Sequence, residues 1–156
     1  MNASILVIAA HGDDEVLGCG GTIARHVNNG DLVHLLLLTD GVSSRGLKGS
    51  SAGQRREDSA EKAKSVLGIK SVDRLDFPDN KMDDVPLLDI VQRVEDKVKL
   101  ISPQRVYTHY HGDLNVDHQL TQRAVMTACR PIPGCCVREI FGFEVVSSTE
   151  WGLQNG

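Results

Sequence analysis

The chain has 156 residues, of which 40% are hydrophobic and 24% are charged, a composition typical of one folded domain with its own core. Its net charge of −4 argues against nucleic-acid binding, because such proteins hold phosphates with clustered lysine and arginine. The four cysteines form no CxxC pair, which indicates reduced thiols rather than disulfides or a structural zinc site. We see no signal peptide and no apolar run long enough to cross a membrane, and we expect a cytoplasmic location.

Short apolar runs alternate along the chain with segments of helical periodicity. Strands are predicted at 4–10, 32–38, 72–75, 105–108 and 140–146. Helices are predicted from Asp14 or Glu15 to about Asn29, over roughly 54–67, from 87 to 101 behind Pro86, and near 117–128. The first two helices are expected to turn Val16, Leu17, Ile23, Ala24, Val27, Ala60, Ala63, Val66 and Leu67 toward the core. The alternation predicts a Rossmann-like, doubly wound α/β fold, with a mostly parallel five-stranded sheet and helices on both faces.

Such sheets bind ligands outside the carboxyl ends of their strands, at the point where the strand order reverses. The strand at 105–108 is followed by polar residues, and so is the strand at 4–10. If these two strands are neighbours, their polar motifs meet at one edge of the sheet, although they are about a hundred residues apart in sequence.

The first polar motif is His11-Gly12-Asp13-Asp14-Glu15. One interpretation is a helix N-terminus, where aspartate is a preferred cap and acids suit the helix dipole. Three adjacent carboxylates repel one another, however, and only one can be the cap. A bound dication would offset that repulsion, with His11 and Asp14 as ligands and Asp13 as a general base.

The second motif, residues 109–118, holds His109, His111, Asp113, Asp117 and His118. A lone histidine is usually structural, but three histidines and two aspartates within ten residues indicate a metal site. Imidazoles and carboxylates are the ligands of catalytic zinc, which keeps one position open for water. Asp117 is expected either to cap a helix or to orient a neighbouring histidine.

Three glycines in the first predicted helix, Gly18, Gly20 and Gly21, raise the alternative of a metal-free nucleotide-binding module. Their spacing is not the GxGxxG that follows a strand, and acids occupy the turn that a pyrophosphate would need. Close packing of the helix against the sheet is the simpler interpretation.

With both motifs in view, the sequence resembles the LmbE-like or PIG-L (GlcNAc-PI de-N-acetylase) family. Ala10-His11-Gly12-Asp13-Asp14-Glu15 is similar to the family's AHPDDE, and Asn115-Val116-Asp117-His118 to its HxDH. Phe77-Pro78-Asp79-Asn80 and the segment 147–151 also resemble family segments. The resemblance covers nearly the whole chain. It implies one deacetylase domain over 1–156, shorter than the usual family chain at its C-terminal end.

The resemblance implies a Zn²⁺ hydrolase that removes the acetyl group from an N-acetylglucosamine-type sugar or glycoconjugate. It implies His11, Asp14 and His118 as the zinc ligands and Asp13 as the base that activates water. Arg56 resembles a residue that contacts the sugar.

Two positions depart from the family pattern. Gly12 stands where proline is usual, which loosens the turn without removing a functional group. Asn115 stands where many members have a histidine that stabilises the oxyanion or protonates the amine. The Asn115 amide can donate to an oxyanion but cannot act as an acid. We therefore assign His111 or His109, or Asp13 in a double role, as the acid.

The expected partner is a small N-acetylated sugar or glycoconjugate, with no nucleic acid and no membrane span. The oligomeric state is open, a homo-oligomer included. The sequence leaves three alternatives: a zinc amidohydrolase acting on a non-sugar N-acyl substrate, the nucleotide-binding module, and an inactive remnant that binds zinc and sugar.

Overall fold

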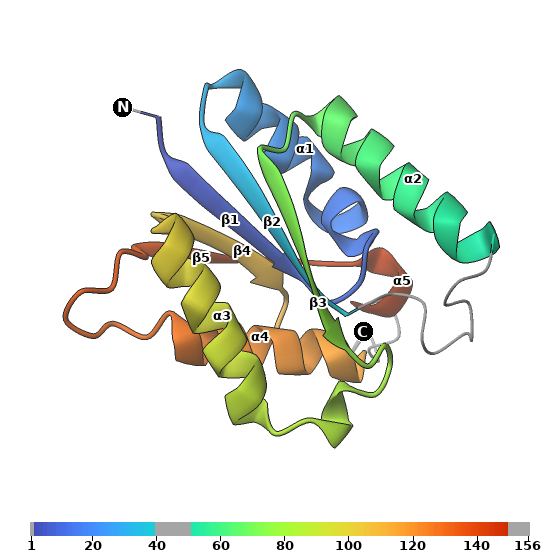
Figure 1. Ribbon diagram of the computed structural model, residues 1–156. Coiled ribbons are helices and arrows are strands. Elements are labelled where there is room, and N and C mark those ends of the chain that lie inside the picture. The colour runs from blue at the N-terminus through green and yellow to red at the C-terminus, as the bar shows by residue number, and fades with distance from the viewer. Residues whose placement is uncertain (1, 40–50, 150–156) are drawn as a thin grey trace, which may run out of the picture.

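The computed structural model describes residues 2–39 and 51–149, without the side chains of residues 51–57, 147 and 149. Strands and helices alternate through these residues (Figure 1). The elements are β1 (Ser4–Ala9), α1 (Asp14–Asn28), β2 (Leu32–Thr39), α2 (Ser51–Leu67), β3 (Ser71–Phe77), the 3₁₀ turn η1 (Met82–Asp84), α3 (Leu87–Ile101), β4 (Arg105–His109), α4 (Val116–Ala128), β5 (Glu139–Phe143) and α5 (Val146–Thr149).

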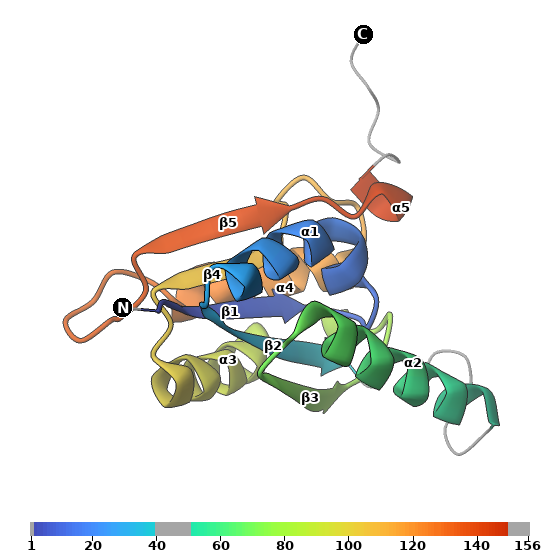
Figure 2. The ribbon, with the colours of Figure 1, turned by 90° about the horizontal axis from the view of Figure 1, so that it is seen from above.

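The five strands form one parallel sheet in the order β3-β2-β1-β4-β5. Figure 2 shows β3 and β5 at its two edges. Strand β1 lies at the centre, where Val7 is aligned with Leu35 of β2 and Tyr107 of β4. The doubly wound fold is thus confirmed, as is the neighbourhood of β1 and β4. The strand order reverses between these two strands, so the switch point lies there.

Strand β1 is apolar and buried from Ile5 to Ala9, as expected of a strand with both faces covered. Ile5 and Val7 belong to the core on the side of α1, whereas Leu6 and Ile8 belong to the core shared with α3 and α4. Figure 1 shows the sheet between these two helical layers, with α2 beside α1. The central strand is therefore packed on both faces, and this packing fixes the position of the loop that follows its carboxyl end.

The predicted inward stripes of the first two helices are partly wrong. On α1, the row that faces the sheet contains Cys19 and Ile23, while Val16 and Leu17 are 40% and 65% exposed. On α2, Leu67 packs against the core, but Val66, rotated about 100° around the helix from it, is 85% exposed. Within the described residues, none of the helices combines the length and the hydrophobicity that a membrane crossing requires.

Three predicted boundaries differ from the structure by two residues or more. Strand β3 extends to Phe77, beyond the predicted 72–75, because it pairs with β2 as far as Thr39. Strand β5 ends at Phe143 rather than near 146, because the next segment turns into α5, where the Ser148 N–H donates to the Val145 carbonyl. Helix α2 begins at residue 51 instead of 54.

Gly18 confirms close packing as the role of one helical glycine. A Cβ atom there would lie 2.5 Å from Phe143 Cδ2 and 2.7 Å from the Glu144 carbonyl oxygen. Gly20 and Gly21 have no such contact, since a Cβ atom would meet its nearest neighbour at 3.9 Å at Gly20 and nothing within 4 Å at Gly21. Only Gly18 is therefore required by the packing of α1 beside β5.

Candidate metal centre

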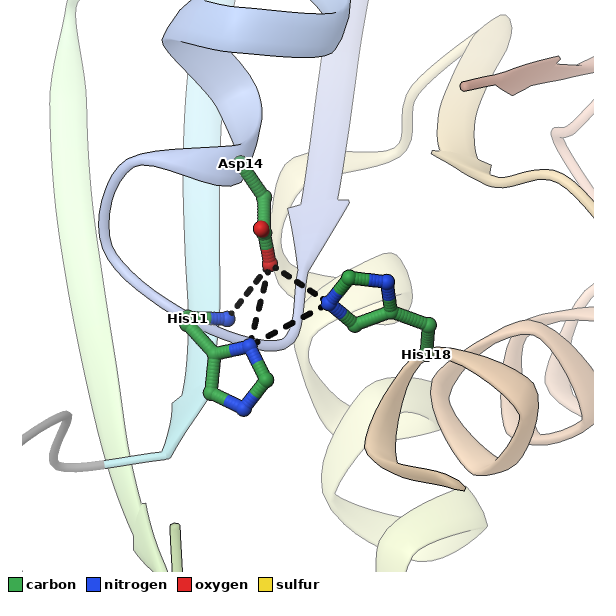
Figure 3. Close-up of side chains that lie close together, drawn as sticks. All are labelled: His11, Asp14 and His118. Carbon is green, nitrogen blue, oxygen red and sulfur yellow. Dashed lines mark hydrogen bonds and ion pairs between the residues drawn. The ribbon is translucent and has the colours of Figure 1, made fainter. Parts of the chain in front are cut away.

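The two polar motifs meet at the carboxyl edge of the sheet. His11 lies in the loop after β1, Asp14 is the first residue of α1, and His118 lies in the first turn of α4. Figure 3 shows the three side chains pointing toward one another from these separate elements. The adjacency of β1 and β4 brings together residues that are 107 positions apart.

Three donor atoms form a nearly equilateral triangle. Asp14 Oδ2 lies 3.3 Å from His11 Nδ1 and 3.3 Å from His118 Nε2, and these two nitrogens are 3.2 Å apart (Figure 3). Ligands that sit about 2.0–2.2 Å from a tetrahedral zinc ion lie roughly 3.3–3.6 Å from one another. The triangle therefore has the dimensions of three zinc ligands with a fourth position open.

His11 is oriented by a carboxylate on its other ring nitrogen. His11 Nε2 lies 3.0 Å from Asp117 Oδ2, so the ring donates Nε2–H to Asp117 and turns the lone pair of Nδ1 toward the triangle. Asp117 is itself held by the backbone N–H groups of Asn80 and Met82, at 2.7 and 3.1 Å. Of the two roles predicted for Asp117, the structure supports orientation of a histidine.

His118 is oriented in the same manner by Asp113. His118 Nδ1 lies 2.8 Å from Asp113 Oδ2, which leaves the Nε2 lone pair facing the triangle. The Ser148 hydroxyl donates to the same carboxylate oxygen at 2.8 Å, and the Asn115 N–H donates to the other oxygen at 2.9 Å. Asp113 and His118 are both buried, so this chain of hydrogen bonds fixes the ring firmly.

The charges around the triangle favour a cation at its centre. Burial would lower the pKa of His11, but hydrogen bonds with Asp117 and Asp14 outweigh it and raise that pKa from 6.5 to about 10. Burial would raise the pKa of Asp14, yet its contacts with His11 and His118 hold it well below its usual range. The pKa of His118 is also raised, because Asp14 and Asp113 outweigh its burial. A divalent ion would supply the positive charge that these carboxylates otherwise draw from protonated imidazoles.

His109 supports the centre without being free to act. Its Nε2 accepts the Ala10 N–H at 2.9 Å, and its ring stacks on His118 with centroids 3.8 Å apart. Burial and the nearby His118 lower the pKa of His109 to about 3, so the ring is neutral at physiological pH. The prediction of His109 as a general acid is therefore wrong, since its Nε2 is occupied and its Nδ1 is buried without a partner.

The acids at the start of α1 have three different environments. Asp13 is exposed and makes no side-chain capping bond, so the predicted aspartate cap is not formed by this residue. Asp14 accepts the His11 N–H at 2.9 Å, which closes the loop around the triangle. Glu15 is buried, and its burial, with the neighbouring carboxylates of Asp14 and Asp13, raises its pKa to about 7.

Three other predicted site residues have different outcomes. Asn115 caps α4, because its Oδ1 accepts the N–H groups of Asp117 and His118 at 2.9 and 3.3 Å, and its NH₂ group remains as the donor. His111 is exposed and packs edge-on against Tyr110, outside the hydrogen-bond network of the triangle. Arg56 lies on α2, but its side chain is outside the described residues.

Two contributors to this centre were not predicted as site residues. Asp79 Oδ1 lies 3.3 Å from His11 Nε2, and Ser148 reaches Asp113 from α5. Their only sequence signal was the family-like segments 77–80 and 147–151. A periodicity argument could not have found them, because both lie outside the two histidine-bearing motifs.

Two further groups could be considered for a cation: His109 with Asp113 and His118, and His11 with Asp79 and Asp117. In each group one pair is already joined by a hydrogen bond, His118 with Asp113 and His11 with Asp117, and Nε2 of His109 already accepts the Ala10 N–H. A pocket of about 490 Å³ lies between α3 and residues 130–136 and shares none of these side chains. The triangle is therefore the best-supported metal site in the described part of the chain.

Known proteins are similar to this chain in sequence and in fold. The model of the GlcNAc-PI de-N-acetylase family (PIG-L) matches residues 6–129. The uncharacterized deacetylase YaiS of Escherichia coli is 33% identical over 149 residues, which are 92% of this chain and 75% of YaiS. The diacetylchitobiose deacetylase of Thermococcus kodakarensis is 35% identical over 81 residues, 50% of this chain and 30% of the relative.

The similarity also extends beyond deacetylases. The 4-oxalmesaconate hydratase of Pseudomonas putida is 30% identical over 134 residues, covering 80% of this chain and 51% of the hydratase. Among solved structures, the conserved protein TT1542 of Thermus thermophilus superimposes with a TM-score of 0.74 at 28% identity, over 91% of this chain and 66% of that one. The chain thus spans about half to three quarters of the length of most of these relatives, and under a third of the Thermococcus enzyme.

Proposed function

Because the chain belongs to the GlcNAc-PI de-N-acetylase (PIG-L) family, we propose that it is a zinc-dependent hydrolase that removes the N-acetyl group from an N-acetylglucosamine-type sugar. The observation that carries this proposal is the triangle of His11, Asp14 and His118, with a carboxylate behind each imidazole. The named deacetylases among its relatives favour amide hydrolysis as the reaction.

The three donors fit zinc in type, spacing and orientation. All are nitrogen or carboxylate oxygen, and each imidazole is held in the tautomer that presents a lone pair to the centre. When bound, zinc would lower the pKa of a water molecule toward about 7 and polarise the amide carbonyl.

Asp13 is the residue we assign as general base. It lies between the ligands His11 and Asp14 in sequence, and its exposed carboxylate is not used as a helix cap. It would accept the proton of the attacking water and hold it for the departing amine. The water oxygen joins the acetyl carbon, the C–N bond breaks, and the products are acetate and a free amino sugar.

We assign two further residues to this reaction. The NH₂ group of Asn115 would donate to the developing oxyanion, because its carbonyl oxygen already caps α4. His111, exposed at the same carboxyl edge, would protonate the amine if Asp13 does not. Arg56 would contact the sugar.

The test combines metal analysis with an amine-release assay. The purified protein should contain about one zinc ion per chain and release amine from N,N′-diacetylchitobiose or N-acetylglucosamine. The Asp13→Asn variant should keep its zinc and lose at least about a hundred-fold in rate, whereas the exposed carboxylate variant Asp83→Asn should match the parent. Full activity of Asp13→Asn would refute the base assignment.

The hydratase relative gives one competing function a specific basis. Addition of water to an unsaturated polycarboxylate also needs an activated water, but it releases no amine. The same protein should therefore be assayed with a non-sugar N-acyl amide and with an unsaturated polycarboxylate. If the protein contains zinc and turns over only one of these two compounds, that compound replaces the sugar as the proposed substrate. If it contains zinc and turns over nothing, it is the inactive remnant. A metal-free protein stabilised by nucleotide would support the nucleotide-binding alternative.

A further inference from the structure

Arg74 of β3 reaches across β2 to the metal-binding loop. A Cβ atom placed on Gly12 would lie 3.2 Å from Arg74 Nη1 and 3.3 Å from Leu37 Cδ1. Leu37 is aligned with Arg74 in the sheet, so the arginine side chain runs along β2 toward the loop after β1. Its guanidinium therefore lies against Gly12, the residue that separates the ligand His11 from the proposed base Asp13 in sequence.

This guanidinium is exposed and has no assigned structural partner. It forms no hydrogen bond or ion pair with another described side chain, and its electrostatic interaction is with the buried Glu15. Two other exposed arginines of the described chain do have close partners, because Arg130 pairs with Glu95 and Arg105 with Glu139. Arg74 can therefore offer its donors to a molecule that approaches from solvent.

Gly12 leaves room for this approach. The family pattern usually has proline at this position, and a side chain there would meet Arg74 at the distance given above. Glycine lets the guanidinium rest on the loop itself, next to the proposed reacting groups.

We propose that Arg74 binds an anionic group of the substrate, a carboxylate or a phosphate, so that this site acts on anionic N-acetylated sugars. This inference rests on the proposed function. An anion that approaches the loop meets the carboxylates of Asp13 and Asp14, and a neighbouring cation offsets that repulsion. A neutral sugar is not repelled by these carboxylates and gains little from the cation. The property to test is therefore the charge of the substrate.

The experiment compares anionic with neutral substrates. The anionic substrates are N-acetylglucosamine 6-phosphate and N-acetylmuramic acid, which carry a phosphate and a carboxylate, and the neutral one is N-acetylglucosamine. The variants are Arg74→Gln, which removes the charge, and Arg74→Lys, which keeps it without the planar fork. Arg25→Gln, an exposed arginine near the other end of α1, is the matched control.

The measured quantity is the ratio of kcat/KM for an anionic substrate to that for the neutral one. Arg74→Gln should lower this ratio by roughly ten-fold, mainly through KM, for at least one anion. Arg74→Lys should keep part of the preference, and Arg25→Gln should keep all of it. The parent's KM for that anion should also rise with NaCl, because an exposed charge is screened.

Equal losses on both kinds of substrate, or a loss of zinc in Arg74→Gln, would overturn the inference, because Arg74 would then only support the loop. An unchanged ratio for both anions would overturn it as well. Gly12→Ala supplies a second variant, in which the added methyl group should push the end of the Arg74 side chain by a few tenths of an ångström and lower the ratio by less than Arg74→Gln does.

A binding measurement separates this inference from the proposed function. In the zinc-loaded Asp13→Asn variant, calorimetry with the same two anions measures affinity without turnover. Adding Arg74→Gln to that variant should weaken binding by roughly ten-fold. If the parent hydrolyses no sugar amide, but Arg74 still governs anion affinity, only the proposed function fails. If Arg74 has no effect on affinity, this inference fails.

Discussion

Asp117 Oδ2 lies 3.0 Å from Nε2 of His11, while Nδ1 of the same ring faces Asp14 and His118. The two nitrogens of one ring thus serve two separate purposes. Loss of a carboxylate behind a histidine ligand typically costs 10–100-fold in metal affinity.

Asp117→Asn should therefore weaken zinc binding by about 10–100-fold. Asparagine has nearly the same size, but it replaces one of the two acceptor oxygens by a donor NH₂ group, so it cannot accept the Nε2–H of His11 and the N–H groups of Asn80 and Met82 together. Competition with a chromophoric chelator measures the affinity. The control is Asp96→Asn on α3, whose side chain is 75% exposed. Parental zinc affinity in a folded Asp117→Asn protein would show that the hydrogen bond does not orient the ligand.

Ser148→Ala should lower the free energy of unfolding by about 1 kcal/mol, because it removes the buried hydroxyl that donates to Asp113. Urea denaturation of the metal-free protein measures this change. Ser65→Ala is the matched control, since the Ser65 hydroxyl donates only to a carbonyl on an exposed part of α2. If the two variants lose equal stability, the buried hydrogen bond from Ser148 to Asp113 contributes no more to the free energy of unfolding than an exposed one.

Gly18→Ala and Gly21→Ala should change stability in opposite directions. At Gly18, the new methyl group would overlap Phe143 and the backbone at Glu144, which should cost about 1–3 kcal/mol. At Gly21, nothing lies within 4 Å, so alanine should stabilise the helix by about 0.5–1 kcal/mol. Thermal or urea unfolding of both variants gives the answer, and a stabilised Gly18→Ala protein would contradict the close contact with β5.

The pair His26 and Asp31 should make part of the stability depend on pH. The His26 hydrogen bond at 2.7 Å, together with the Ala3 N–H at 2.9 Å, lowers the pKa of Asp31 below its usual 3.8. The unfolded chain then binds more protons than the folded one in acid, so this contribution is complete above pH 3.8 and is lost as the pH falls through the lowered pKa.

Asp31→Asn should therefore be less stable than the parent at pH 7, by no more than about 1 kcal/mol, because solvent screens a pair at the surface. The difference should shrink as the pH falls toward about 3. Urea titrations between these pH values test this. The stability difference of His26→Gln should also shrink toward low pH but not vanish, because this variant loses the hydrogen bond with Tyr107 as well as the one with Asp31. A difference that stays constant with pH would exclude ionisation of Asp31 as its cause.

Much of the fold follows from local patterns in the sequence. The unbroken apolar run in β1 predicts a central strand, and the stripe of Ile90, Val94 and Val98 predicts the buried side of α3. Alternation of strands and helices then implies a parallel sheet, and the neighbourhood of β1 and β4 brings His11 and His118 together.

The detailed pairing at the centre could not be predicted in this way. That Asp117 faces His11 while Asp113 faces His118 depends on how α4 is rotated and on the rotamers of all four side chains. Ser148 comes from a four-residue helix with no periodic signal of its own. The direction of Arg74 likewise depends on a strand whose pairing with β2 extends beyond its own sequence pattern.

The three donors of the triangle are made at very different times during translation. His11 and Asp14 leave the ribosome early, whereas His118 follows only after roughly a hundred further residues, and β4 must then insert beside a strand that already has β2 on its other side. The growing polypeptide therefore cannot assemble the full donor set until most of its sheet exists. We expect metal acquisition to be a late step, coming after the domain has folded.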